Sequence, residues 1–308
     1  MRFGLALPQY GFSLTDGSVG FDVTADWALR AEGLGFDSVW LSDHFFYSFG
    51  RYGADPSPIA TLEPMTALAG LAAVTDRIRL GTLVLCAPFR SPPVLARMAA
   101  TIDGLSAGRF ELGLGAGWLR DEFEAFGLPF EESARRFDVL EQTLAGLSER
   151  GGVPLWVGGK GGPRMLRLAA ELADGWNSVW RVDPVAHTGR MQAAAAACER
   201  AGRDPATLRA SVGLYSVIAQ TENQARSLFE DWRSRFPGGA MDRDTWQGWC
   251  ADTLSVSPEQ AVERVGQIQA LGVEEIVISP GVLPFTLWEP EMLDLIAERV
   301  IAPARAGA

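Results

Sequence analysis

The sequence predicts an α/β protein built as a single (β/α)8 barrel. Strand and helix patterns alternate along the chain and give eight apolar strands, nearly all of them followed by a helical segment. Sequential βα units favour right-handed parallel crossovers, and eight such units close into a barrel. The length of 308 residues suits one large barrel, whereas a doubly wound open sheet would need fewer strands or a second domain. We therefore expect one barrel domain over residues 1–308.

In the first half of the chain, the helix boundaries follow from capping residues and prolines. Asp22 is placed to cap the first helix, which ends near Gly33. Pro64 stands in the first turn of the second helix, and Ser91 precedes the third. The expected strands are 2–7, 38–41, 78–85 and 109–114, and the expected helices are 23–32, 64–74, 92–105 and 131–147.

In the second half, the same alternation continues to the end of the chain. Ser257 and Gln260 have the spacing of a capping box at the start of a helix. The longest irregular stretch is 236–257, which is rich in Trp, Gly and Asp, and a stretch of this kind is typical of an active-site lid. The expected strands are 155–157, 175–180, 208–219 and 273–279, and the expected helices are 163–173, 184–201, 222–235, 258–271 and 290–300.

Composition excludes several classes of function. The net charge of −11 argues against nucleic acid and against anionic membranes, which both select basic surfaces. Cys86, Cys198 and Cys250 are far apart without metal-ligand spacing, which indicates free thiols in a reducing cytoplasm. The first residues are too short and glycine-broken for a signal peptide. No apolar run reaches the roughly 18 residues of a membrane span.

Three strand ends carry most of the functional information. Strands 38–41, 78–85 and 109–114 each run into polar or glycine-rich residues at their carboxyl ends, which is the end of a parallel barrel where chemistry occurs. His44, one of two histidines, lies there beside Asp43. The ordinary pKa of imidazole, about 6.5, suits a proton donor or acceptor at neutral pH.

These motifs together resemble the luciferase-like monooxygenase superfamily and, within it, the oxidoreductases that depend on the deazaflavin coenzyme F420. The matching pieces, in order, are SDH at 42–44, LGT at 80–82, LGLGAGWLRDEFEAFG at 112–127, LWVGG at 155–159 and ADGWN at 173–177. The chain departs from the pattern between 147 and 154, where members of the superfamily usually carry a longer segment. This short connection predicts a more open substrate site.

The resemblance implies where a flavin-like ring would bind. A bulge in the third strand, with a non-proline cis peptide at Leu83–Val84, would press on the middle of the ring, with Thr82 and Cys86 beside it. Backbone N–H groups of two glycine-rich loops would cradle the phosphate, the second of them at a helix N-terminus with Lys160 and Arg164 adding charge. The expected loop residues are Gly115, Ala116 and Gly117, and then Gly159, Lys160, Gly161, Gly162, Pro163 and Arg164.

The resemblance also implies roles for side chains around the ring. Asp43 would lie near the ring edge, and His44 would transfer the substrate's proton. Trp118 stands where some sugar-phosphate-oxidising relatives have a glutamate, which argues against that activity, and Glu122 is a second acid–base candidate. Trp118 and Trp180 would line the substrate pocket, whereas Trp176 is expected in the core.

Three functions remain open at this stage. The first is hydride transfer between F420 and a small organic substrate, with His44 as proton donor or acceptor. The second is monooxygenation by reduced FMN and oxygen, with a partner reductase supplying the flavin. The third is a flavin-binding barrel without turnover. The resemblance further implies a cytoplasmic homodimer, and the sequence does not identify the substrate.

Overall fold

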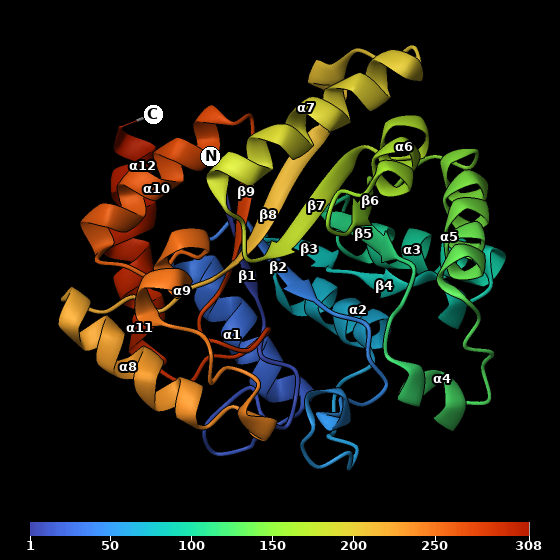
Figure 1. Ribbon diagram of the computed structural model, residues 1–308. Helices are drawn as coiled ribbons and strands as arrows, with labels where there is room; N and C mark the ends of the chain where they lie inside the picture. Colours follow the sequence, from blue (N-terminus) through green and yellow to red (C-terminus); the bar gives the residue numbers. More distant parts are fainter. Residues whose placement is uncertain (308) are drawn as a thin grey trace.

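The computed structural model describes residues 1–307 and contains a closed parallel barrel surrounded by helices (Figure 1). The strands follow one another in the order β3-β2-β1-β9-β8-β7-β6-β5-β4, and a further β3–β5 pairing closes the ring. The strands are β1 (Arg2–Ala6), β2 (Ser38–Leu41), β3 (Arg79–Thr82), β4 (Leu85–Cys86), β5 (Phe110–Gly115), β6 (Leu155–Gly158), β7 (Gly175–Trp180), β8 (Arg209–Tyr215) and β9 (Glu275–Ser279).

The barrel has eight strand positions because β3 and β4 are two halves of one predicted strand, both paired with β5. The outer ring of helices confirms the predicted (β/α)8 architecture. The helices are α1 (Phe21–Gly33), α2 (Pro64–Val74), α3 (Pro92–Leu105), α4 (Arg120–Ala125), α5 (Ser133–Ser148), α6 (Pro163–Leu172), α7 (Pro184–Arg200), α8 (Glu222–Ser234), α9 (Trp246–Asp252), α10 (Pro258–Ala270), α11 (Glu291–Ile296) and α12 (Ala302–Ala306).

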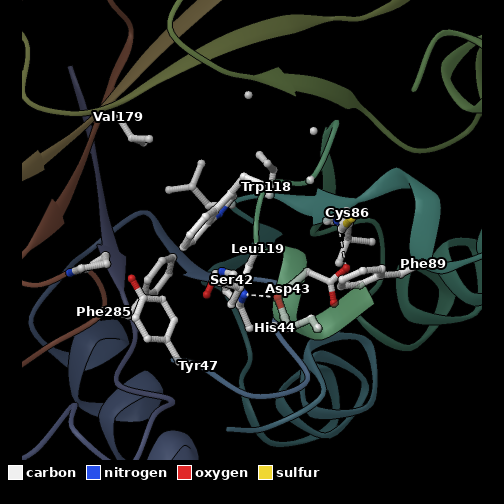
Figure 2. Close-up of a pocket in the computed structure, with 18 of the residues that line it drawn as sticks. Ser42, Asp43, His44, Tyr47, Cys86, Phe89, Trp118, Leu119, Val179 and Phe285 are labelled. Carbon is white, nitrogen blue, oxygen red and sulfur yellow. Dashed lines mark hydrogen bonds and ion pairs between the residues drawn. The ribbon is translucent and has the colours of Figure 1, made fainter. Parts of the chain in front are cut away.

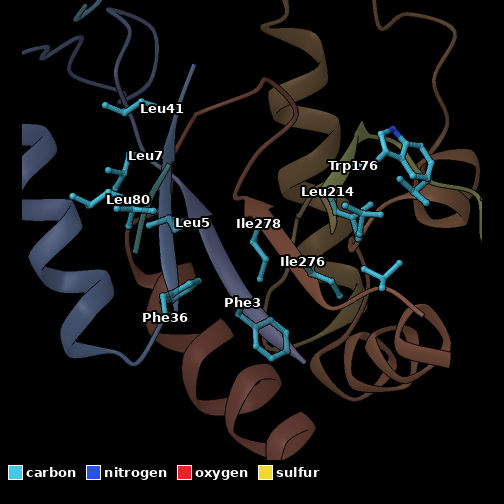
Figure 3. Packing of buried hydrophobic residues seen from close by; sticks show 14 of the residues in the cluster. Phe3, Leu5, Leu7, Phe36, Leu41, Leu80, Trp176, Leu214, Ile276 and Ile278 are labelled. Carbon is cyan, nitrogen blue, oxygen red and sulfur yellow. The ribbon is translucent and has the colours of Figure 1, made fainter. Parts of the chain in front are cut away.

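Alternation along the strands separates two apolar layers. Phe3 and Leu5 of β1 belong to the large cluster between sheet and helices, together with Ile276 and Ile278 of the neighbouring β9 (Figure 3). Ala6 of β1 belongs instead to a second cluster, in the barrel interior and at its mouth. Successive side chains of a strand point to opposite faces, so a strand buried on both faces is apolar throughout.

Two tryptophans fill the middle of the barrel. The rings of Trp40 and Trp156 meet edge to face with centroids 6.4 Å apart, and both side chains are buried. The Trp156 indole N–H donates to Glu111 Oε2 at 2.7 Å, and the Trp40 indole N–H donates to Ser38 Oγ at 2.8 Å. The interior is therefore a packed core, and the space open to a ligand lies toward the carboxyl ends of the strands.

Several boundaries differ from the sequence predictions. Helix α1 begins at Phe21 with Gly20 as N-cap, so Asp22 lies inside the first turn and is not the cap. Ser91 occupies the N-cap position of α3 without a side-chain hydrogen bond. The irregular stretch 236–257 contains helix α9, and α4 was not predicted at all. Both helices are shorter than two full turns, which leaves too little periodicity to recognise.

The capping box of α10 is confirmed, because the side chains of Ser257 and Gln260 each accept from the other's backbone N–H. At the far end, the chain continues past residue 300 through a π-helical turn into α12. Arg305 there pairs with Asp37 and lies 5.8 Å from the Phe3 ring, which brings the two ends of the chain together. No helix within residues 1–307 combines the length and apolar character needed to cross a lipid bilayer.

Candidate active site

A cavity opens at the carboxyl ends of the barrel strands, where three sequence motifs predicted a site. Tyr47 and Phe285 lie on one side of His44, and Cys86 and Phe89 lie on the other (Figure 2). Most of the predicted site residues line this cavity, namely Asp43, His44, Leu83, Val84, Cys86, Gly115, Gly117, Trp118, Glu122, Gly159 and Trp180.

His44 is held by a carboxylate on one side of its ring. Its Nδ1 lies 2.7 Å from Glu122 Oε2, and the backbone N–H of Phe45 donates to Glu122 Oε1 at 2.6 Å. Since an ionised carboxylate only accepts hydrogen bonds, Nδ1 carries the proton. This tautomer leaves Nε2 as an acceptor, and no group within residues 1–307 hydrogen-bonds it.

Glu122 reaches His44 because of the short helix α4, which follows the glycine-rich end of β5. Phe123, the next residue of α4, is buried against Phe89 and Phe130, with ring centroids 5.0 and 5.1 Å away. This aromatic anchor directs the adjacent Glu122 side chain inward, where it is almost fully buried. Local apolar packing thus fixes a charged group that the helix alone would leave in solvent.

Asp43, the chain neighbour of His44, is occupied by a guanidinium. Arg90 donates to both of its carboxylate oxygens, at 2.6 and 2.9 Å, and also to Glu63 Oε1 at 2.5 Å. The backbone N–H of Cys86 donates to Asp43 Oδ2 at 2.9 Å. Asp43 therefore ties the β4 segment to the end of β2, and its place near the edge of a bound ring stays a prediction.

The Leu83–Val84 peptide bond is cis, as the resemblance implied, and a second non-proline cis bond joins Val179 and Trp180. Val84 lies in a recess formed by glycines. A Cβ atom on Gly158 would lie 2.5 Å from Val84 Cγ1, and one on Gly115 would lie 2.8 Å from Val84 Cγ2. Any side chain at these two positions would displace Val84, which lines the cavity between β5 and β6.

Asn177, which the sequence analysis missed, presents the one unpartnered amide oxygen of the cavity wall within residues 1–307. Its Nδ2 donates to Ser211 Oγ at 2.7 Å, while its buried Oδ1 has no hydrogen-bond partner. A buried polar atom without a partner is costly, so Asn177 Oδ1 is a candidate acceptor for a donor group on a ligand in the cavity. The signal was available in the sequence, because an inward position in strand 175–180 carries Asn beside Trp176.

The predicted phosphate loop reaches the cavity only at its beginning. Gly158 and Gly159 line the cavity, whereas Lys160, Gly161, Gly162, Pro163 and Arg164 do not. Arg164 turns outward instead and pairs with Asp138 and Glu141 of α5 at 2.6 and 3.0 Å. Two carboxylates thus engage its guanidinium in this structure, and its role as a phosphate ligand stays a prediction.

Two further predicted residues, Thr82 and Ala116, also lie outside the cavity lining. Thr82 is fully buried, and its hydroxyl exchanges hydrogen bonds with the backbone N–H and C=O of Gly113, so it joins β3 to β5. Trp180 lines the cavity and Trp176 is buried, in agreement with their predicted places.

The cavity environment keeps the Tyr10 phenol and the Cys86 thiol neutral. Burial, the largest influence on each, raises the pKa of Tyr10 and that of Cys86, and the nearby carboxylates of Asp43 and Glu122 raise both further. A thiol in this environment stays protonated near neutral pH and is a poor nucleophile. The titratable group suited to proton transfer in the cavity is therefore the imidazole of His44.

The segment 236–257, predicted as a lid, lies beside the cavity rather than in its lining. Phe236 packs on Phe49 and Tyr52 with ring centroids 6.0 and 5.6 Å apart. Arg181, just past β7, pairs with Asp244 and Asp252 at 2.6 and 2.9 Å. The segment thus joins two loops of the barrel mouth.

Comparison with known proteins gives a consistent result. The model of the family described as luciferase-like monooxygenase matches residues 1–150 and 139–275. Pyrimidine monooxygenase RutA of Rhizobium rhizogenes is 31% identical over 298 residues, which cover 82% of this chain and 75% of that protein. The F420-dependent glucose-6-phosphate dehydrogenase of Microbacterium testaceum is 28% identical over 318 residues, which cover 89% of this chain and 92% of that protein.

Among solved structures, an F420-dependent secondary alcohol dehydrogenase in complex with an F420-acetone adduct superposes with a TM-score of 0.79. The two proteins share 16% identity, and the match covers 98% of each chain. At this identity the likeness bears on the fold alone, and it agrees with the closed parallel barrel described above.

Proposed function

The chain belongs to the luciferase-like monooxygenase family and is an enzyme of the oxidoreductase class, and from this premise we propose that it is an F420-dependent oxidoreductase. It would transfer a hydride between the deazaflavin and a small organic substrate, with His44 moving the accompanying proton. The observation that carries the proposal is the His44–Glu122 pair, which leaves Nε2 without a hydrogen-bond partner within residues 1–307, on a residue that lines the cavity at the carboxyl ends of the strands.

The residues of the cavity fit a flat, three-ring cofactor. The unpartnered Asn177 Oδ1 would accept a hydrogen bond from the N–H at the pyrimidine edge of such a ring. Val84 would press against the ring, and the backbone of Gly158 and Gly159 can approach closely. Bound there, F420 supplies a carbon centre that gives or takes a hydride and reacts poorly with oxygen.

The protein's own contribution is orientation and proton transfer at one atom. Glu122 fixes the imidazole through Nδ1, so Nε2 takes up or returns the substrate proton. The carboxylate also stabilises the imidazolium that exists while the proton rests on the ring. Asp43 and Arg90 hold the Cys86 segment, which forms the facing wall, in a fixed position.

A second candidate is a monooxygenase that uses reduced FMN and oxygen, with the flavin supplied by a reductase. It is favoured by the similarity to the pyrimidine monooxygenase, which covers 82% of this chain. The ring-lined cavity also serves this candidate, because oxygen chemistry on a flavin requires that water be kept out.

Binding titrations with each cofactor test the proposal. Purified protein is titrated with F420 and with oxidised FMN, and oxygen consumption is followed with reduced FMN. We expect tight F420 binding, little FMN binding and no oxygen consumption. Oxygen consumption with reduced FMN would favour the second candidate, and the absence of binding to either cofactor would contradict both.

A variant pair links the titration to the site. Loss of a buried hydrogen bond costs about 1–3 kcal/mol, so Asn177→Ala should weaken F420 binding by roughly 10- to 100-fold. Asn223→Ala, on the exposed surface of α8, is the matched control and should leave the affinity unchanged. Equal affinities for the two variants would remove Asn177 from the cofactor site.

A further inference from the structure

The walls of the cavity around His44 are made of aromatic rings. The ring centroids of Tyr47, Trp118 and Tyr10 lie 5.4, 5.5 and 6.1 Å from that of the His44 imidazole. Phe285 continues this wall, 6.2 Å from Tyr10, and Figure 2 shows Tyr47 and Phe285 on the same side of His44. A ligand that reaches His44 therefore contacts mostly ring carbon.

Of the two tyrosines in this wall, Tyr10 has its hydroxyl already engaged. The hydroxyl of Tyr10 is already hydrogen-bonded to Ser42 Oγ, which also donates to Gln9 Oε1. Burial, the largest influence on each, raises the pKa of Tyr10 and that of Tyr47, so both stay neutral at working pH. His44 Nε2 has no hydrogen-bond partner within residues 1–307, so it is a polar atom on this side that can receive a ligand's hydrogen bond.

The charges at the site are unfavourable for an anion. The residues that line the cavity include the carboxylates of Asp43 and Glu122 but no lysine or arginine. Of the guanidinium groups around the mouth, Arg90 pairs with Asp43 and Glu63, and Arg181 pairs with two aspartates of the segment 236–257. Arg51 lies over the Trp118 ring and is not part of the cavity lining. A carboxylate or phosphate on the substrate would lose its hydration here and gain no cation.

Trp118 is the aromatic residue of this wall that is exposed to solvent. It is 40% exposed, and the guanidinium of Arg51 lies 4.5 Å from its ring, while His44 meets the ring edge to face. The indole thus contacts both the Arg51 guanidinium and the His44 imidazole. A substitution at position 118 changes both the ring surface and the access of positive charge to the site.

On these grounds, and resting on the proposed function, we propose that the substrate is an uncharged molecule with a flat, aromatic or similarly apolar body. Its reactive oxygen or nitrogen lies at His44 Nε2, and its body packs against Tyr47, Trp118 and Phe285. Anionic substrates, including phosphorylated sugars and carboxylates of the same shape, are excluded by the two carboxylates and the absence of a free lining cation within residues 1–307.

The test uses two probes of the same shape that differ in charge, acetophenone and 4-acetylbenzoate. Binding of each to the full chain is measured by saturation-transfer NMR and by titration calorimetry, with and without F420. An unpaired buried charge costs at least about 1.4 kcal/mol, so we expect the neutral probe to bind roughly tenfold or more tightly. Equal binding, preference for the anion or failure of both probes to bind would overturn the proposal.

Two variants make the test specific to the ring wall. Trp118→Phe keeps an aromatic ring and should keep the preference for the neutral probe. Trp118→Arg places a guanidinium beside His44 and should reduce or reverse the preference. An unchanged ratio in Trp118→Arg would also contradict the proposal.

This outcome is independent of the cofactor assignment. Probe binding is read without turnover, and F420 affinity is measured separately on the same samples. If the protein does not bind F420 but still prefers acetophenone to 4-acetylbenzoate, the proposed function alone is contradicted. If it binds F420 but does not distinguish the two probes, the substrate class alone is contradicted.

Discussion

The two histidines of the chain lie in opposite surroundings. His44 lines the cavity just past the end of a barrel strand, where Glu122 holds its Nδ1 and its Nε2 has no hydrogen-bond partner within residues 1–307. His187 lies in α7, fully buried, stacked on Trp176 at 5.5 Å, and neither of its ring nitrogens has a hydrogen-bond partner. Desolvation, with a smaller contribution from Arg190, lowers the pKa of His187 to about 4.

The comparison shows that an imidazole can act in proton transfer when one of its nitrogens is held by a partner and the other is free to meet a substrate. His187 has lost its water and gained no acceptor, so it behaves as a neutral aromatic ring in the core. His44 has one nitrogen fixed by a carboxylate and the other free, which is the arrangement that orients an acid–base group. The predictions below test this contrast, beginning with the largest expected effect.

Replacing His44 by Ala should remove the proton-transfer group while leaving the cofactor walls in place. Because general acid–base catalysis contributes about 10²- to 10⁴-fold, we expect turnover to fall by that factor with little change in F420 affinity. His187→Phe, which keeps a buried ring on Trp176, is the control and should retain turnover. Full turnover in His44→Ala would show that His44 does not transfer the proton.

Asp43 is the chain neighbour of His44, but both of its carboxylate oxygens already accept hydrogen bonds within the protein. Arg90→Met leaves the buried Asp43 carboxylate without its cation, which costs about 3–5 kcal/mol for a buried pair. We expect urea unfolding to show this loss, whereas Arg51→Met, at an exposed guanidinium, should cost less than about 1 kcal/mol. A similar small effect in both variants would mean that the Asp43 pair does not stabilise the fold.

The barrel and the position of His44 were predictable because they depend on local pattern. Alternating strands and helices fix the architecture, and the carboxyl end of a barrel strand places His44 at the mouth. Glu122 was named as a candidate, but its contact with His44 depends on helix α4, whose six residues carry little periodic signal. The homodimer stays a prediction.

The predicted phosphate loop shows why other site residues could not be assigned from the sequence. A glycine-rich loop before a helix is compatible with an anion site, but whether its arginine is free depends on non-local packing. Arg164 is placed opposite Asp138 and Glu141 by the contact of α6 with α5. The same holds for Asp43, whose partner Arg90 follows a short helical turn after β4.

Glu122→Gln tests the fixed side of the His44 ring. The substitution keeps the size of the side chain but removes the charge from a hydrogen bond that is typically worth about 1.5–3 kcal/mol. We expect kcat to fall roughly 10- to 100-fold and the pH–rate profile to move relative to that of the wild type. Glu124→Gln, exposed on the same helix, is the matched control, and an unmoved profile in Glu122→Gln would reduce Glu122 to a structural residue.

The smallest effect concerns His187 and the dependence of stability on pH. The pKa of His187 is lowered in the folded protein, so below about pH 6.5 this residue binds a proton in the unfolded chain but stays neutral in the folded chain. Native stability from this residue is therefore complete above pH 6.5 and is lost as the pH falls toward 4. Between pH 7.5 and 5.5 this loss amounts to about 1 kcal/mol, and His187→Phe should abolish it in urea unfolding at the two pH values.

Proton NMR checks the same point directly, because His44→Ala leaves His187 as the one imidazole of the chain. Its ring signals should stay constant from pH 8 to about pH 5, since a group with a pKa near 4 remains neutral over that range. A midpoint near 6.5 would show that water reaches His187. It would also contradict the description of His187 as a neutral ring of the core.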